Sequence, residues 1–439
     1  MDFDLRDVRG QLAVLWTLVL ATGTAAMVIA ATPPAGSWME SRTGETELLP
    51  QIKGMTDLAR QAVRPRVRTD DRAPVASVSA PEGFSWGVNT FLQHEVGEAR
   101  RARVTRMVAE TGFTWIRQPM PWQDVEIHGR GDYEDRRNHP PRSAWYKYDT
   151  IVRQAEAHGL EVVFRLDNPP AWTRAGGDGV GVQAPPDEPA DFAAFAKAVA
   201  DRYKGRVRYY QIWNEPNIYP EWGEQPVSPE AYAELLAVAA GSIRSVDPDA
   251  VIVLAAMAAT TAYAGDTEPG GNLNDLIYLQ RLYDAGAAEW FDVLAVQGYG
   301  LWSGPLDRRM HPLVLNFGRA RYVRDLMVRN GDGATPMWIS EMNWNTVPLD
   351  RPAPFGRVAP DEQGRFLIQA FRRIEDEWPW LTLANVWYFK RARPDWEERD
   401  DPQAWFRLMD HNGKPAQAWY DLYHWFGFRR DAQGSSNPP

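Results

Sequence analysis

Two glutamates at the ends of apolar, strand-like segments could carry acid–base chemistry. Glu215 lies in the sequence WNEPN at residues 213–217, and Glu341 ends the apolar run at residues 337–341. Two carboxyl groups that face one reaction centre can act as a nucleophile and as a general acid, which is the combination that cleaves a glycosidic bond. This pair is therefore the candidate catalytic site.

The residues expected around the two glutamates differ in charge. Arg117 and Tyr299 are candidate neighbours of Glu341, and a guanidinium group and a phenol would stabilise its carboxylate form. Glu215 has no obvious cationic partner, so it could keep its proton. The sequence therefore predicts Glu341 as the nucleophile and Glu215 as the general acid and, later in the cycle, the general base.

Eight short apolar runs alternate with segments of helical spacing between residues 83 and 427. This alternation predicts an α/β fold, a (β/α)8 TIM barrel with long rim loops. A doubly wound sheet is the alternative, but residues 87–90 do not form the glycine-rich phosphate turn that such a sheet usually carries after its first strand. The expected strands cover residues 84–89, 114–120, 161–167, 208–214, 251–257, 292–299, 337–341 and 383–389.

The barrel would bring the two glutamates together. Chemistry in such barrels lies at the carboxyl ends of the strands, and the glutamates end strands four and seven. A barrel radius of roughly 7.5 Å leaves about 5 to 6 Å between the carboxyl groups, near the ~5–5.5 Å of retaining glycosidases. Side chains alternate along a strand, so Asn214 and Glu215 can both face the mouth only if the strand bends or ends before Pro216.

These motifs resemble the catalytic signature of glycoside hydrolase clan A, most closely family 39, with family 5 next. WNEPN would end strand four and Glu341, in WISEMNWN, would end strand seven. The stretch from Trp115 to Leu166 adds Trp122 and Glu126 at the spacing W-x-x-x-E. The resemblance covers about residues 83–427.

The resemblance implies roles for the residues around the pair. Glu215 would be the acid/base and Glu341 the nucleophile. Arg117 and Tyr299 would position Glu341, and Asn214 would bind the hydroxyl beside the anomeric carbon. The floor of the subsite for the cleaved sugar would be formed by Trp387.

Four further residues keep more than one interpretation. Gln297 stands where many relatives have a histidine before the tyrosine, which leaves that supporting contact open. Trp172 and Trp222 follow strands three and four and could stack on sugar rings or belong to the core. Asp167 could bind a hydroxyl or cap a turn.

Composition excludes several other functions. The chain has no cysteine, which excludes disulfides, thiolate metal sites and cysteine nucleophiles. Its net charge of -10 argues against nucleic acid or an anionic lipid surface as a partner. The seven histidines show no metal-ligand spacing, and the chemistry needs no cofactor. Tryptophan, at 20 residues, outnumbers both tyrosine and phenylalanine at 16 each, and broad aromatic rings suit sugar ligands.

The N-terminal part predicts attachment to a membrane. Residues 12–31 are almost entirely apolar, long enough for a transmembrane helix, so residues 1–39 are an expected anchor with the catalytic domain outside the cytoplasm. A cleaved signal peptide, which would make the protein secreted, is the alternative. Residues 40–82 would form a stalk with one short helix near residues 55–63, and residues 428–439 a disordered tail.

An anchored barrel of this kind resembles family 39 hydrolases of bacterial exopolysaccharide biosynthesis. That resemblance implies internal cleavage of an exported polysaccharide, with synthesis or export machinery as a possible partner. Long loops at residues 342–360 and 391–413 would wall a groove, and acidic residues in the second would disfavour an anionic polymer. The alternatives are a transglycosylase and a non-catalytic carbohydrate-binding subunit.

Overall fold

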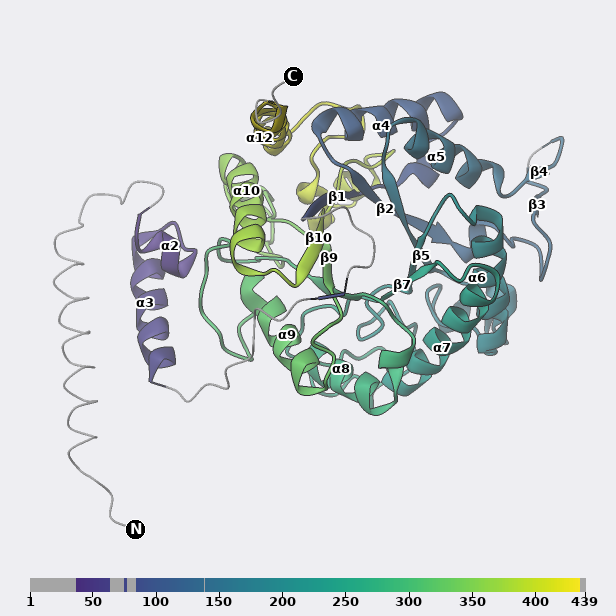
Figure 1. Ribbon diagram of the computed structural model, residues 1–439, viewed down its shortest axis with the longest axis horizontal. Helices are drawn as coiled ribbons and strands as arrows, with labels where there is room; N and C mark the ends of the chain where they lie inside the picture. The colour runs from purple at the N-terminus through teal and green to yellow at the C-terminus, as the bar shows by residue number, and fades with distance from the viewer. Residues whose placement is uncertain (1–36, 64–74, 77–83, 138, 435–439) are drawn as a thin grey trace, which may run out of the picture.

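The computed structural model describes residues 37–63, 75–76, 84–137 and 139–434, and its centre is a barrel of eight parallel strands (Figure 1). The sheet order is β7-β6-β5-β2-β1-β10-β9-β8, and parallel bridges Val253–Val293 and Met257–Val296 join its two edges. The predicted TIM barrel and its eight strands are thereby confirmed. The strands are β1 (Ser85–Asn89), β2 (Trp115–Pro121), β5 (Glu161–Asp167), β6 (Tyr209–Ile212), β7 (Val251–Leu254), β8 (Leu294–Gln297), β9 (Met337–Met342) and β10 (Leu381–Val386).

Helices follow the strands and surround the barrel (Figure 1). Several begin at proline, whose fixed φ suits the first helical turn, and Ser228 caps α7 by accepting a hydrogen bond from the Ala231 amide at 3.1 Å. A short hairpin, β3 (Glu134–Asp135) and β4 (Arg142–Ser143), projects from the loop after β2. The helices are α4 (Glu98–Thr111), α5 (Tyr146–Ala157), α6 (Pro189–Tyr203), α7 (Pro229–Val246), α8 (Asp275–Asp284), α9 (Ala320–Arg329), α10 (Pro360–Glu377), α11 (Asp395–Glu398) and α12 (Gln417–Gly434).

Inside the barrel, an apolar layer supports a polar layer. The rings of Trp115, Tyr209 and Trp338 pack there with centroids 4.7 to 5.6 Å apart. Two residues further along β2 and β6 come Arg117 and Gln211, which therefore face the interior as well, nearer the carboxyl ends of the strands. The polar side chains of the site thus rest on packed rings that exclude water from below.

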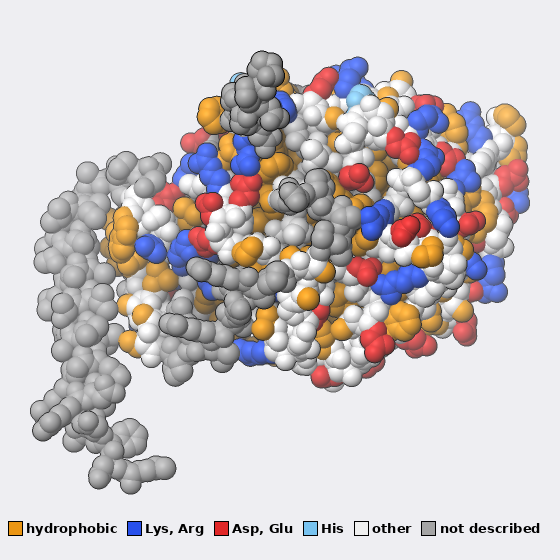
Figure 2. Space-filling view, viewed as in Figure 1, with side chains coloured by type: hydrophobic (Ala, Val, Ile, Leu, Met, Phe, Trp, Pro, Cys, Tyr) orange, Lys and Arg blue, Asp and Glu red, His pale blue; other side chains and the backbone are white. Residues whose placement is uncertain are grey.

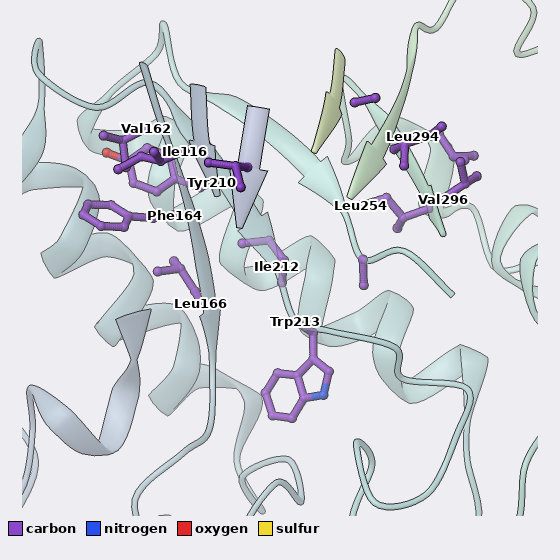
Figure 3. Packing of buried hydrophobic residues seen from close by; sticks show 14 of the residues in the cluster. Ile116, Val162, Phe164, Leu166, Tyr210, Ile212, Trp213, Leu254, Leu294 and Val296 are labelled. Atoms are coloured by element: carbon purple, nitrogen blue, oxygen red, sulfur yellow. The ribbon is translucent and has the colours of Figure 1, made fainter. Parts of the chain in front are cut away.

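The outward-facing side chains of the strands form the main core against the helices. Figure 3 shows Ile116, Phe164 and Ile212, from three neighbouring strands, in this layer, and all three are fully buried. Burial of one such side chain contributes about 1.5–3 kcal/mol to folding. This layer fixes where each strand ends and hence where the site residues stand.

Two helices before the barrel, α2 (Glu40–Thr43) and α3 (Leu48–Ala62), contact the loop after β8 and helix α10. The Gln61 amide donates to the Arg308 carbonyl at 3.1 Å and accepts from the Met310 amide at 2.6 Å. Glu45 forms an ion pair with Arg309 at 2.6 Å, and buried Glu40 pairs with Arg365. Over its described residues, the segment predicted as a stalk is therefore docked on the barrel, because its polar side chains find partners there.

The structure describes the predicted C-terminal tail in part and the predicted N-terminal membrane helix not at all. Helix α12 continues to Gly434, past residue 428 where the sequence predicts the tail. Within the described part of the chain, none of the helices has the length and apolar character needed to cross a bilayer. The predicted membrane helix at residues 12–31 lies outside the described residues.

Candidate active site

The chain segment that carries Glu215 leaves the sheet before it reaches the glutamate. Strand β6 ends at Ile212, and Trp213 and Glu215 have left-handed φ angles of 73° and 36°. Such angles are costly for residues other than glycine and persist only where the surroundings hold them. The turn breaks the alternation of side chains, so neighbouring Asn214 and Glu215 can both serve the mouth, as the sequence required.

Glu341 reaches the same rim through a β-bulge. Ile339 pairs with Val296 and Glu341 with Gln297, so Ser340 is the extra residue on β9. Ser340 accepts a hydrogen bond from the Gln211 amide inside the barrel at 2.8 Å. The extra residue lets Ser340 and Glu341, although adjacent, both contribute to the interior.

Arg117 connects these side chains. Its guanidinium group donates to Glu341 Oε1 at 2.7 Å and to Asn214 Oδ1 at 2.9 Å. It also donates to Asn89 Oδ1 at 2.8 Å and to Gln211 Oε1 at 2.6 Å. The planar group is buried, and its fork of donors fixes acceptors from β1, β9 and the end of β6 in one arrangement.

Tyr299 holds the second oxygen of Glu341. Its hydroxyl donates to Glu341 Oε2 at 2.8 Å. Burial and the nearby Glu341 charge raise the pKa of Tyr299 well above its ordinary value, which keeps the phenol protonated as a donor. Each carboxylate oxygen of Glu341 therefore accepts a hydrogen bond, one of them from a cation.

Glu215 lies in a different electrostatic environment. Burial raises the pKa of Glu215 to about 8, and the negative charges of Glu341 and Glu221 act in the same direction. The Gln297 amide donates to Glu215 Oε1 at 2.5 Å and opposes this shift. Glu215 thus carries a proton at neutral pH, close to a carboxylate that is stabilised as an anion.

Part of the barrel matches a known family of enzymes in sequence. The family model described as Cellulase (glycosyl hydrolase family 5) matches residues 79–290, which include the WNEPN segment. The barrel is thus similar in sequence to this clan A family over these residues. No curated protein gives a significant match to the sequence.

Solved structures of the same fold come from several glycoside hydrolase families. A family 39 glycoside hydrolase from Bacteroides cellulosilyticus WH2 has a TM-score of 0.54 and 18% identity over 80% of this chain and 64% of that chain. The exo-β-1,4-mannosidase Op5Man5 from Opitutaceae bacterium strain TAV5 has a TM-score of 0.53 and 16% identity over 85% of this chain and 64% of that chain. A family 39 β-xylosidase from Caulobacter crescentus has a TM-score of 0.51 and 18% identity over 79% of this chain and 71% of that chain. The chain thus spans 64% of the length of the first two proteins, and the likeness concerns the fold.

The sequence predicted only some of the hydrogen-bond partners in the site. Gln297 was an open position and proves to be the donor to Glu215. Gln211 and Ser340 were not predicted, although a polar residue two positions after a buried ring on a barrel strand is a usable signal. Glu221 was also missed, and burial raises its pKa to about 7.

The three candidate aromatic residues differ in how deeply their side chains are buried. Trp387 is 8% exposed and lies edge-on to Phe91, with ring centroids 5.4 Å apart. Trp172 is half-buried, and its indole donates to the Glu126 carbonyl at 2.8 Å. Trp222 is 1% exposed and packs edge-on against Trp213, so the prediction that it could stack on a sugar is wrong and it belongs to the core.

Asp167 neither caps a turn nor faces solvent. Its side chain is 2% exposed and forms an ion pair with Arg165 at 2.6 Å. Asp167 and Arg165 lie two residues apart on β5 and both face the barrel interior. In the described part of the chain, no cluster of three or more histidine or carboxylate side chains has the geometry to bind a metal ion.

Proposed function

We propose that this domain is a retaining glycoside hydrolase in which Glu341 is the nucleophile and Glu215 the acid/base. The contrast between the two carboxyl groups carries this proposal. Arg117 and Tyr299 stabilise the carboxylate of Glu341, whereas burial and neighbouring negative charges keep Glu215 protonated. The predicted separation of about 5 to 6 Å fits the retaining mechanism.

The proposed reaction has two steps. Glu341 attacks the anomeric carbon while Glu215 gives its proton to the departing glycosidic oxygen, which leaves a glycosyl–enzyme ester. Glu215 then takes a proton from water, the resulting hydroxide attacks the anomeric carbon, and Glu341 departs as a carboxylate. Asn214 accepts a hydrogen bond from Arg117 through its side-chain oxygen, and its NH2 group would donate a hydrogen bond to the hydroxyl beside the anomeric carbon.

The proposed substrate is an exported polysaccharide that is cleaved internally while the enzyme is anchored by residues 1–39. The apolar run at residues 12–31 supports the anchor, and the long rim loops support a binding site for several sugar units. Trp387 would be the floor of the subsite for the cleaved sugar, and half-buried Trp172 is a second aromatic candidate.

A substrate screen with matched variants tests this function. Wild-type protein and the variants Glu341→Gln and Glu215→Gln are compared on aryl glycosides and polysaccharides, with proton NMR of the first-formed anomer. We expect turnover with retained configuration for the wild type and loss of about 10⁴-fold or more for Glu341→Gln. Turnover by Glu341→Gln, or an inverted first product, would reject the mechanism.

The same screen separates the alternatives. A transglycosylase would give longer products when oligosaccharide acceptors are added, because the acceptor would replace water in the second step. A non-catalytic binding subunit would bind glycans without turnover, and the two Gln variants would bind as the wild type does.

A further inference from the structure

Close to Trp387 lies a cavity whose lining includes His94 and two arginines. Phe91, edge-on to Trp387, stacks on His94 with ring centroids 6.1 Å apart and 4° between the planes. The Arg391 guanidinium lies over the rings of Phe91 at 4.8 Å and Trp396 at 4.0 Å. The cavity has a volume of about 370 Å³, and His94, Arg391 and Arg393 are among its lining residues.

A second cavity, of about 480 Å³, continues on the other side of His94. It lies between the segment after β1 and the loop that contains the β3–β4 hairpin, and its wall includes Arg142, Lys147 and Asp124. His94 lines both cavities, and Phe91 links its ring to that of Trp387, the proposed sugar floor. We call the two cavities together the His94 groove.

The carboxylates of the His94 groove are already neutralised within the protein. Asp395 pairs with Arg391 at 2.9 Å, and Asp124 pairs with Lys147 at 2.7 Å. The other three acidic side chains of the lining behave in the same way. They pair as Glu95 with Lys390, Glu98 with Arg153, and Asp135 with Arg137.

The acidic loop at residues 391–413 is partly neutralised by arginines. Glu397 is paired with Arg407 at 3.0 Å. Asp400 is paired with Arg351, and Asp401 accepts a hydrogen bond from the Gln403 amide at 2.9 Å. Three of its carboxylates, those of Asp395, Glu397 and Asp400, are therefore compensated by arginines, so the loop presents less negative charge than its sequence predicts.

Two guanidinium groups are left over. Arg142 and Arg393 are exposed, and neither has a carboxylate partner among the residues that the structure describes. Burial and the Arg391 charge lower the pKa of His94, so this ring adds apolar surface and no charge at neutral pH. The groove therefore carries a local positive charge on a protein whose net charge is -10. Figure 2 shows acidic and basic side chains interspersed on the described surface in that view.

We propose that the His94 groove binds carboxylate-bearing sugar units of an acidic polysaccharide, with Arg142 and Arg393 as the ligands of the carboxylates. A guanidinium group presents parallel donors that match a carboxylate, and the neutral His94 ring between the two cavities offers apolar surface to a sugar ring. The proposal rests on the proposed function and specifies its substrate class, since Phe91 links the ring of His94 to that of Trp387.

Binding to a catalytically silent protein tests the groove independently of turnover. The full chain carrying Glu341→Gln is titrated with polygalacturonate, alginate, hyaluronate and xanthan, each as the native polymer and as its neutral carboxyl-reduced form. Arg142→Gln and Arg393→Gln are added singly and together. Arg208→Gln is the control, because exposed Arg208 precedes β6 at the opposite end of the barrel.

We expect at least one native polymer to bind at least about tenfold more tightly than its reduced form, and each arginine replacement to cost about tenfold. Added salt should weaken binding of the native polymer alone. The control should bind like the parent, and all variants should keep the parent melting temperature because Arg142 and Arg393 are exposed. Equal affinity for native and reduced forms, binding of neutral glycans only, no binding of any acidic polymer, or full affinity in the double variant would overturn the proposal. Failure of the proposed function would instead appear as absence of turnover by the wild type or turnover by Glu341→Gln.

Discussion

Arg117 donates hydrogen bonds to side chains from β1, β6 and β9 and from the segment after β6, and one of these acceptors is Glu341. A buried cation with four acceptors attracts the carboxylate that it holds and fixes its orientation. The sequence predicted this contact from rim positions alone. It could not predict that the same group also holds Asn214, because that depends on the left-handed turn at Trp213.

Replacement of Arg117 with lysine should therefore not be conservative. A lysine carries the charge but lacks the planar fork, so Asn89, Gln211 and Asn214 would lose their common donor. We expect kcat/KM to fall by about 10²-fold or more, with a smaller effect on KM. The measurement is steady-state kinetics on the best aryl glycoside, with circular dichroism to check folding. A loss of less than about threefold in a folded variant would mean that Arg117 does not organise the site.

Two substitutions around Glu215 should move the alkaline limb of the pH profile in opposite directions. The proton of Glu215 is needed in the first step, so activity should fall as pH rises through its pKa, about 8. Gln297→Leu removes a donor to the carboxylate and should shift this limb to higher pH. Glu221→Gln removes a repelling negative charge and should shift it to lower pH.

The readout of these two variants is kcat/KM as a function of pH, which reports the free enzyme. The two variants control for each other, because a general loss of structure would not shift the alkaline limb to higher pH in one variant and to lower pH in the other. Shifts in the same direction, or an alkaline limb unchanged in both variants, would contradict the role of Glu215 as the acid.

At the scale of elements, the alternation of apolar runs and helical segments was enough to predict all eight strands. The order of the strands around the barrel follows from the same pattern, so the positions of Glu215 and Glu341 on one rim could also be predicted. The bulge at Ser340 and the end of β6 at Ile212 could not, because both depend on pairing with neighbouring strands. The two interpretations of Trp222 could not be separated for a related reason, since its burial depends on how the loop after β6 packs the ring against Trp213.

Helices α2 and α3 should contribute to the stability of the barrel. A chain that begins at residue 83 loses the Glu45–Arg309 and Glu40–Arg365 ion pairs and the Gln61 hydrogen bonds, whereas a chain that begins at residue 37 keeps them. We expect the shorter chain to melt at least about 2–4 °C lower in differential scanning calorimetry, as for a loss of ~1 kcal/mol. Equal melting temperatures would show that the helices rest on the barrel without stabilising it.

At the scale of the whole molecule, the chain combines an eight-stranded barrel with a proposed membrane anchor. The barrel could be predicted because its pattern is repeated eight times along the chain. The docking of residues 40–62 could not, because their partners, such as Arg309 and Arg365, lie more than 250 residues away in the sequence. The charge of the His94 groove could not be predicted either, because the sequence does not distinguish carboxylates that form ion pairs from those that do not.

The anchor predicts how the protein partitions between fractions. The full chain should sediment with membranes and stay there after an alkaline carbonate wash, because an apolar segment of about 20 residues spans the bilayer core. A chain from residue 37 should remain in the supernatant. Recovery of a full-chain product that starts near residue 32 in the soluble fraction would instead identify a cleaved signal peptide.

The central claim is that Glu341 forms the covalent glycosyl–enzyme intermediate, and trapping that intermediate tests it most directly. The protein is incubated with a series of 2-deoxy-2-fluoro glycosides, which slow the second step, and is then digested and examined by mass spectrometry. We predict one added glycosyl group on the peptide that contains Glu341, present in Gln297→Leu and absent in Glu341→Gln. A glycosyl group on another residue, or labelling that persists in Glu341→Gln, would contradict the account.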